Sequence, residues 1–178
     1  MIHLERPRAD EYAAAYGGYV ARVPRGDLVR ILDRQIRATV TLLKSVPPGQ
    51  EDHAYAPGKW TIKEVAGHLA DVERVMGYRA LRIARGDATE LAGYDDEAYV
   101  AAGCFGGRAL ADLVGELRTV RRATVSLFAG LPADAWTRRG HANGEPVSVR
   151  ALACIIAGHE LHHRALLRDR YLAAGRRR

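Results

Sequence analysis

Cysteine is scarce in this chain: Cys104 and Cys154 are the only two among 178 residues, and no Cys-x-x-Cys pair occurs. We therefore expect neither a disulfide framework nor a thiolate-bound metal site. Cys154 lies in an apolar run and is predicted to be a small core residue. Cys104 lies in a glycine-rich segment, where a free thiol is expected.

Long hydrophobic runs are also missing. No apolar stretch approaches the roughly 20 residues that span a bilayer. Residues 1–7 lack the charged-then-apolar layout of a secretory signal peptide. We therefore expect a cytoplasmic protein that makes no membrane contact.

Lysine is rare as well, because 3 of the 27 basic residues are lysine and the other 24 are arginine. The formal net charge of +6 would suit a protein that binds nucleic acid. However, acidic and basic residues interleave along most of the chain, and no basic stripe carries interspersed aromatic residues. No nucleic-acid partner is expected.

Length and composition are those of one globular unit, since 178 residues with 48% apolar content can bury a sizeable core. We predict a single domain over residues 1–178. Residues 1–25 would form an N-terminal arm that serves as a lid or packing arm, with a short amphipathic piece at 9–19 ended by Gly17-Gly18. Residues 174–178 would form a basic tail.

Apolar residues recur at intervals of three and four in four long segments, the pattern of amphipathic helices. Three of these segments have N-terminal caps: Asp27, the Thr61 to Glu64 capping box and Ser148. The predicted helices cover about residues 27–45, 61–86, 108–129 and 148–167.

Alternating β-branched runs are almost absent, so the fold class is predicted to be all-α, a four-helix bundle. The long connection between helices two and three carries a short accessory helix at 93–100, and another turn of helix is expected at 133–136. If Asn143-Gly144 joins anything, it joins two short extended pieces.

Three of the seven histidines, His159, His162 and His163, lie within five consecutive residues of the last helix. His159 and His163 are four residues apart, so their rings share one apolar face. Two buried imidazoles are either core histidines that donate to carbonyl groups or ligands of one metal ion. The second interpretation requires a third ligand elsewhere in the chain.

His68, on the buried stripe of the second helix, is the third candidate. Three neutral imidazoles with one open position form a catalytic rather than a structural zinc arrangement. His162 is the rival within the last helix, but it points about 100° away from His163. The predicted metal ligands are therefore His68, His159 and His163.

Other polar residues are weaker candidates. Asp71 would either accept a hydrogen bond from a ligand ring or pair with Arg74 or Lys63 on the helix surface. Glu73 and Glu160 point away from the ligand direction. Three histidines are expected to be solvated: His3, His53 and His141.

Residues 159–163 also fit the His-Glu-x-x-His pattern of zinc peptidases. Those enzymes need a further ligand downstream, and the residues after His163 contain neither histidine nor glutamate. A peptidase of that kind is not expected.

Two segments resemble the DinB-like and YfiT-like family of metalloenzymes. They are Trp-Thr-x-x-Glu-Val with His-Leu-x-Asp-x-Glu in residues 57–73, and His-x-x-x-His in residues 158–163. The resemblance implies a four-helix bundle that holds a divalent metal, usually zinc or nickel, on three histidines. The matching positions here are His68, His159 and His163.

The resemblance extends over residues 27–173 and implies an activity. Family members with known activity are S-transferases or isomerases that use a low-molecular-weight thiol such as bacillithiol or mycothiol, and others were named as metal-dependent hydrolases. The family name refers to DNA-damage induction, so a stress role is also considered. No thiol-binding signature is recognisable in this sequence.

Three functions follow. The first is a metal-dependent transferase that lowers the pKa of a thiol and transfers it to an electrophilic small molecule. Arg79, Arg82 or Arg164 would hold carboxylates of the thiol, although as abundant surface residues they are more simply solvated.

The second function is hydrolysis by a metal-bound water, for which no general base is evident. The third is a non-catalytic protein that sequesters metal or dimerises. A homodimer would use apolar residues that lie outside the main stripe of their helices, such as Leu81 and Leu161.

Overall fold

The computed structural model describes residues 5–173, so His3 and the predicted basic tail at 174–178 lie outside the described residues. Within this range the helices are α1 (Gly17–Arg22), α2 (Leu28–Lys44), α3 (Ile62–Ala84), α4 (Asp96–Ala102), α5 (Leu110–Ala129) and α6 (Val149–Leu166). The strands are β1 (Arg139–Ala142) and β2 (Glu145–Ser148). Single turns of 3₁₀ helix lie at Ala9–Glu11, Ala14–Tyr16, Phe105–Gly107 and Ala133–Thr137, and a π-helical turn follows α6 at Leu167–Tyr171.

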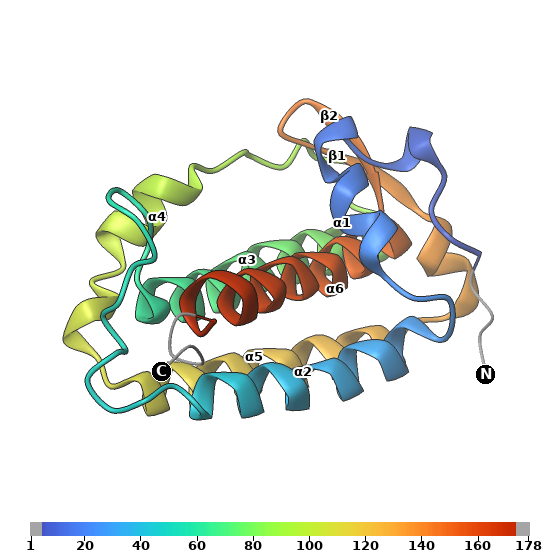
Figure 1. The fold of residues 1–178 in the computed structure, drawn as a ribbon. Coiled ribbons are helices and arrows are strands. Elements are labelled where there is room, and N and C mark those ends of the chain that lie inside the picture. The colour runs from blue at the N-terminus through green and yellow to red at the C-terminus, as the bar shows by residue number, and fades with distance from the viewer. Residues whose placement is uncertain (1–4, 174–178) are drawn as a thin grey trace.

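The four long helices form a bundle in which α2 and α3 each pack against both α5 and α6 (Figure 1). After α3, the chain runs back along the length of the bundle before α5 begins, so α3 and α5 point in the same direction. The all-α four-helix bundle and its long second connection are therefore confirmed. This connection also carries α4, the predicted accessory helix.

The predicted caps are present. Asp27 Oδ1 accepts hydrogen bonds from the backbone N–H groups of Val29 and Arg30 at 3.0 and 3.2 Å. The Thr61 hydroxyl accepts from the Glu64 N–H at 3.2 Å, while the Glu64 carboxylate accepts from the Thr61 N–H at 2.6 Å. Local sequence therefore determines where α2 and α3 begin.

Asn143 and Gly144 form the two-residue turn between β1 and β2, with φ angles of 57° and 76°. Both angles are in the left-handed region that Asn and Gly tolerate best, so the predicted pairing of two extended pieces is confirmed. Leu91 joins this hairpin: its N–H donates to His141 at 3.0 Å, and its carbonyl accepts from Asn143 at 2.9 Å. The hairpin thereby holds the start of the α3–α5 connection.

The N-terminal arm differs from the prediction. Gly17 and Gly18 were expected to end a short amphipathic piece, but they begin α1. A Cβ atom added at Gly158 of α6 would lie 2.0 Å from the Tyr19 carbonyl oxygen. The position of α1 therefore depends on close backbone packing against α6, which local sequence preference does not reveal.

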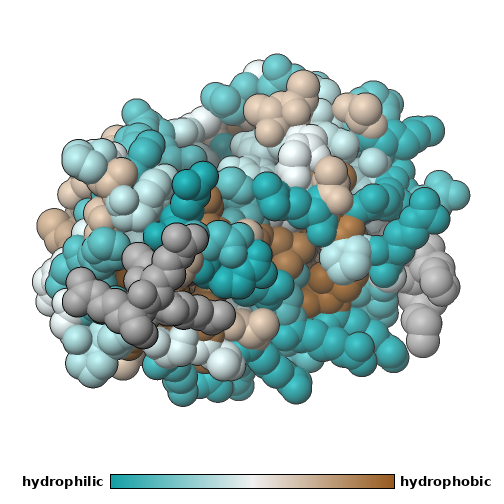
Figure 2. Space-filling model, in the orientation of Figure 1, coloured by the Kyte–Doolittle hydropathy of each residue, from teal (hydrophilic) through white to brown (hydrophobic). Residues whose placement is uncertain are grey.

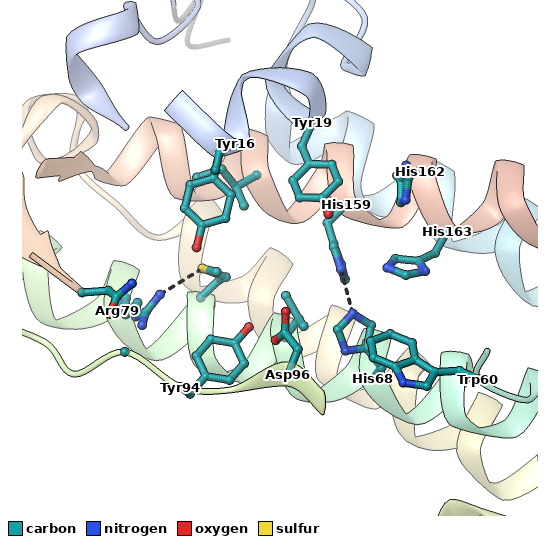
Figure 3. Close-up of a pocket in the computed structure, with 16 residues that line it drawn as sticks. Tyr16, Tyr19, Trp60, His68, Arg79, Tyr94, Asp96, His159, His162 and His163 are labelled. Carbon is teal, nitrogen blue, oxygen red and sulfur yellow. Dashed lines mark hydrogen bonds between the residues drawn. The ribbon is translucent and has the colours of Figure 1, made fainter. Parts of the chain in front are cut away.

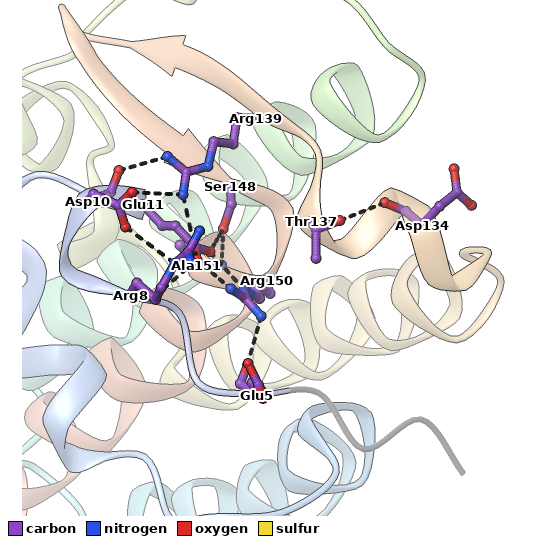
Figure 4. Close-up of polar contacts among 10 residues, drawn as sticks. All are labelled: Glu5, Arg8, Asp10, Glu11, Asp134, Thr137, Arg139, Ser148, Arg150 and Ala151. Carbon is purple, nitrogen blue, oxygen red and sulfur yellow. Dashed lines mark hydrogen bonds and ion pairs between the residues drawn. The ribbon is translucent and has the colours of Figure 1, made fainter.

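An ion pair fastens this arm to the start of α6 (Figure 4). The Glu11 carboxylate accepts hydrogen bonds from Ser148 Oγ and Arg150 Nε, both at 2.7 Å. Burial alone would raise the pKa of Glu11, but the hydrogen bonds from Arg150 and Ser148 lower it to about 2. Ser148 also caps α6 by accepting from the Ala151 N–H, so one side chain links the arm to the helix.

Apolar side chains fill the bundle and the space beneath the hairpin, where Trp136 stacks on Phe128 with ring centroids 5.3 Å apart. Cys154 is buried and Cys104 is a free thiol, as predicted, and Cys104 is exposed. The face shown in Figure 2 is mostly hydrophilic, with one hydrophobic area near its middle. Within residues 5–173, no helix combines the length and apolar character needed to cross a membrane.

A buried polar network links all four bundle helices. Arg121 of α5 donates to both carboxylate oxygens of Glu73 on α3, at 2.7 and 2.8 Å, and to Glu160 on α6 at 2.6 Å. Gln35 and Thr39 of α2 also donate to the Glu160 carboxylate. Burial alone would lower the pKa of Arg121, but the charges of Glu160 and Glu73 raise it, so the guanidinium remains charged.

We predict that Arg121→Met lowers the free energy of unfolding by about 3–5 kcal/mol, because two buried carboxylates would lose their shared cation. Urea denaturation followed by circular dichroism measures this loss. Arg122→Met is the matched control, because Arg122 is the next residue of α5 and is exposed. Equal stability of the two variants would contradict the structural role of the network.

Candidate functional site

Three histidine side chains converge between α3 and α6. His68 comes from α3, and His159 and His163 come from successive turns of α6. Their ring centroids are 4.5 to 4.9 Å apart, and one nitrogen of each ring lies within 4.8 Å of one nitrogen of the other two. The structure thus brings the three sequence-predicted residues together.

The geometry of the ring nitrogens fits a metal ion. The Nε2 atoms of His68 and His159 face each other at 3.0 Å. Two nitrogens bound to one tetrahedral zinc at 2.0–2.1 Å would be about 3.4 Å apart. Nδ1 of His163 is buried and has no hydrogen-bond partner among the described residues. The nitrogens of the three rings are thus close enough to bind one cation.

Electrostatics keep these rings neutral. They are 3, 6 and 7% exposed for His68, His159 and His163 in turn. Burial lowers the pKa of His68 and lowers that of His163 to about 3. Burial, reinforced by repulsion from the neighbouring histidines, lowers the pKa of His159 well below its usual value. Neutral imidazole is the form that binds metal ions.

Aromatic side chains surround the cluster (Figure 3). The Trp60 ring packs on His68 with centroids 4.5 Å apart and lies nearly parallel to His163 at 6.3 Å. Tyr19 of α1 contacts His159 edge-on at 5.4 Å. The residues that start α3 and the N-terminal arm therefore both contribute to the walls of the site.

A cavity of about 330 Å³ adjoins the histidines. Tyr16 and Tyr19 enter it from the N-terminal arm, and Tyr94 and Asp96 enter it from the α3–α5 connection (Figure 3). Arg79 lines the end of the cavity opposite the histidines. This volume is within the usual range for small-molecule sites.

The structure also shows where the remaining candidate site residues lie. Asp71 accepts a hydrogen bond from Arg74 at 3.2 Å, which is the surface pairing, and has no bond to a histidine ring among the described contacts. His53 and His141 are exposed, as expected. His162 lines the cavity, but it lies outside the group of three rings.

The structure corrects one expectation about charged residues and agrees with another. Arg79 was expected to be solvated, but the α3–α5 connection covers it, and it is buried. Glu73 and Glu160 were weak site candidates, and the structure places them in the buried network with Arg121. Arg82 pairs with Asp87, and Arg164 donates to the Gln35 carbonyl, so these two arginines have partners away from the cavity.

Sequence reasoning missed the cavity residues outside the bundle, namely Tyr16, Tyr19, Tyr94 and Asp96. Their segments, 14–19 and 93–96, are short, and the predicted amphipathic piece and accessory helix did not indicate which side of the bundle these side chains would face. Two signals could have pointed to them: aromatic enrichment in residues 12–19 and the unusual length of the α3–α5 connection.

Comparisons with known proteins agree with this picture. The model of the DinB superfamily matches residues 31–167. YfiT from Bacillus subtilis is similar to this chain, with a TM-score of 0.74 and 18% sequence identity. The match covers 86% of this chain and 93% of YfiT. YfiT is described as "a probable metal-dependent hydrolase with an unusual four-helix bundle topology". A DinB-like protein of Bacillus subtilis, YjoA, has a TM-score of 0.61 and 19% identity, covering 84% and 92% of the two chains. No curated protein sequence matches this chain.

We predict that Gly158→Ala destabilises the protein by at least about 1–3 kcal/mol, because its Cβ would overlap the Tyr19 backbone and push α1 off α6. Thermal unfolding measures the effect. Gly115→Ala is the control: it lies on the exposed side of α5 with open space around it, and it should stabilise by about 0.5–1 kcal/mol. A neutral Gly158→Ala variant would show that this contact does not position α1.

Proposed function

This chain belongs to the DinB superfamily, and we propose that it is an enzyme that uses a divalent metal ion, bound by His68, His159 and His163, to act on a small molecule in the adjoining cavity. The observation that carries the proposal is the convergence of three buried, neutral imidazoles on one point at the wall of that cavity. A structural zinc site would instead be closed by a fourth protein ligand.

Zinc is the metal that we propose first, and nickel is the alternative, because imidazole nitrogen suits both ions. When bound, such an ion acts as a Lewis acid and lowers the pKa of a thiol or of water. The buried Nδ1 of His163 and the close approach of the two Nε2 atoms support a bound cation.

The surrounding residues would bind and orient the substrate. Trp60 and Tyr19 exclude water from the histidines by packing on His68 and His159. The Asp96 carboxylate lies in the cavity between Tyr94 and His68 (Figure 3), where it can accept a proton from a nucleophile.

For the reaction, we propose transfer of a low-molecular-weight thiol of the bacillithiol or mycothiol type to an electrophilic carbon. The thiol gives its proton to Asp96, a sulfur–carbon bond forms, and the leaving group departs with the electron pair of the broken bond. Support comes from the family resemblance and from the apolar cavity lining of Val72, Met76 and Ile155, which suits an organic electrophile.

Hydrolysis of a small ester or amide is a second candidate that one observation favours. The sequence offered no general base, whereas the structure places the Asp96 carboxylate in the cavity. A carboxylate there can activate water as readily as a thiol.

Metal sequestration without catalysis is less consistent with an adjoining cavity of this size. The single domain, the homodimer and the cytoplasmic location stay predictions from the sequence.

We predict that freshly purified protein contains about one divalent metal ion per chain. Substitution of His68, His159 or His163 by alanine should remove most of it, as measured by inductively coupled plasma mass spectrometry. His53→Ala is the control and should retain it, because His53 is exposed and outside the cluster. Absence of metal from the wild type, or equal content in all variants, would contradict the proposal.

We predict that the metal-loaded enzyme conjugates bacillithiol or mycothiol to members of an electrophile panel, and that chelation and Asp96→Asn abolish this activity. Asp112→Asn, on the exposed start of α5, should leave it unchanged. Ester hydrolysis without any thiol transfer, lost in Asp96→Asn, would select the hydrolase instead. If neither reaction occurs across the panel, the enzymatic proposal is wrong.

A further inference from the structure

Arg79 is a buried cation for which the described part of the chain supplies no counter-ion. Its side chain is only 4% exposed, yet it forms no ion pair with any described residue. Its protein contacts are hydrogen bonds to the Ala92 carbonyl at 2.7 Å and the Met76 sulfur at 3.7 Å, and a stacking contact over the Tyr94 ring at 5.5 Å. The other buried arginines, Arg121 and Arg150, are each paired with a carboxylate.

An unpaired buried charge is costly, because desolvation of a guanidinium is offset only by a negative partner and well-placed acceptors. A guanidinium has five N–H donors in a planar fork that fits carboxylate or phosphate. With two protein acceptors, Arg79 retains donors for a ligand. Because Arg79 lines the cavity, an anionic group bound there could supply the missing partner.

The periodicity of α3 places this cation relative to the histidine cluster. His68, Val72, Met76 and Arg79 are spaced by four, four and three residues, so they lie along one stripe of the helix, and all four line the cavity. The eleven residues from His68 to Arg79 correspond to about three turns, or about 16 Å along the helix axis. The cavity therefore has the three histidines at one end, an apolar floor and a cation at the other end (Figure 3).

Opposite this floor, α6 contributes a second stripe to the cavity, in which Ile155 precedes His159 by one turn. Both helices thus present an apolar residue next to a histidine. The residues that line the cavity include one carboxylate, Asp96, which lies on the histidine side of Tyr94 and not beside Arg79 (Figure 3).

We propose that this cavity selects an elongated small molecule with a carboxylate or phosphate at one end, bound by Arg79, an apolar middle over Val72 and Met76, and its reacting group at the histidine cluster. This inference rests on the proposed function for the identity of the reacting end. The anion site itself stands on the burial and the missing counter-ion of Arg79. If the reaction is thiol transfer, the anionic end belongs either to the thiol or to the electrophile.

The test measures binding of three probes with the same pentyl chain, hexanoate, pentyl phosphate and the neutral hexanamide, to the protein as purified. Two-dimensional NMR titrations give the dissociation constants. We expect the anions to bind more tightly than hexanamide, and Arg79→Gln to weaken the better anion at least about tenfold while leaving hexanamide unchanged. Whichever anion binds more tightly identifies the favoured end group.

Matched variants separate a specific role of the Arg79 guanidinium from the general effect of removing one positive charge from α3. Arg82→Gln is the control, since Arg82 lies one turn later on α3 and already pairs with Asp87. Arg79→Lys should retain part of the preference, because lysine keeps the charge but loses the planar fork. Thermal unfolding of each variant reports whether the fold is intact.

Two outcomes would overturn the inference: equal binding of the anions and hexanamide to the wild type, or anion binding that survives in folded Arg79→Gln but is lost in His163→Ala. The second outcome would place the anion on the metal. Metal content is measured in the same samples, so that failure of this inference can be told apart from failure of the proposed function. Arg79→Gln should keep its metal although it loses the anion site. Protein without metal should still bind the anion at Arg79.

Discussion

The antiparallel contact between α3 and α6 is the constraint on which the rest of the structure depends. It places His68, seven residues into α3, beside the last turns of α6, where His159 and His163 lie. The buried network of Arg121, Glu73 and Glu160 fixes the same two helices from inside the bundle. Because Glu160 directly follows His159, the charge network and the imidazole cluster share one stretch of backbone.

This arrangement combines two kinds of buried polar groups with different requirements. In the Arg121 network the charged groups are matched within the protein, since each carboxylate has a charged donor and the guanidinium has acceptors. The histidine cluster and Arg79 are incomplete, because Nδ1 of His163 has no hydrogen-bond partner and the Arg79 guanidinium has no carboxylate partner among the described residues. Completed groups stabilise a fold, whereas incomplete ones in a cavity indicate where a ligand binds.

Much of the bundle could be predicted from local sequence, because capping residues and apolar periodicity act over a few residues. Asp27, the Thr61 to Glu64 box and Ser148 begin their helices as expected. The four-residue spacing of His159 and His163 likewise placed both rings on one face. The site residues outside the bundle could not be predicted, because their positions depend on tertiary contacts such as α1 at Gly158 and the α3–α5 connection over Arg79.

The parallel direction of α3 and α5 has a consequence for how such a site can diversify. Because of it, the chain must return along the whole bundle between these two helices. This connection and the N-terminal arm together supply three tyrosines and a carboxylate to the cavity. The histidines that are candidates for metal binding come from the bundle itself. Substitutions in the N-terminal arm or the α3–α5 connection can therefore alter which molecules enter while the long helices and their histidines stay unchanged. The wall of the cavity thus has two sources, the bundle with its histidines and Arg79, and the outer segments with their tyrosines and Asp96, and each source can vary separately.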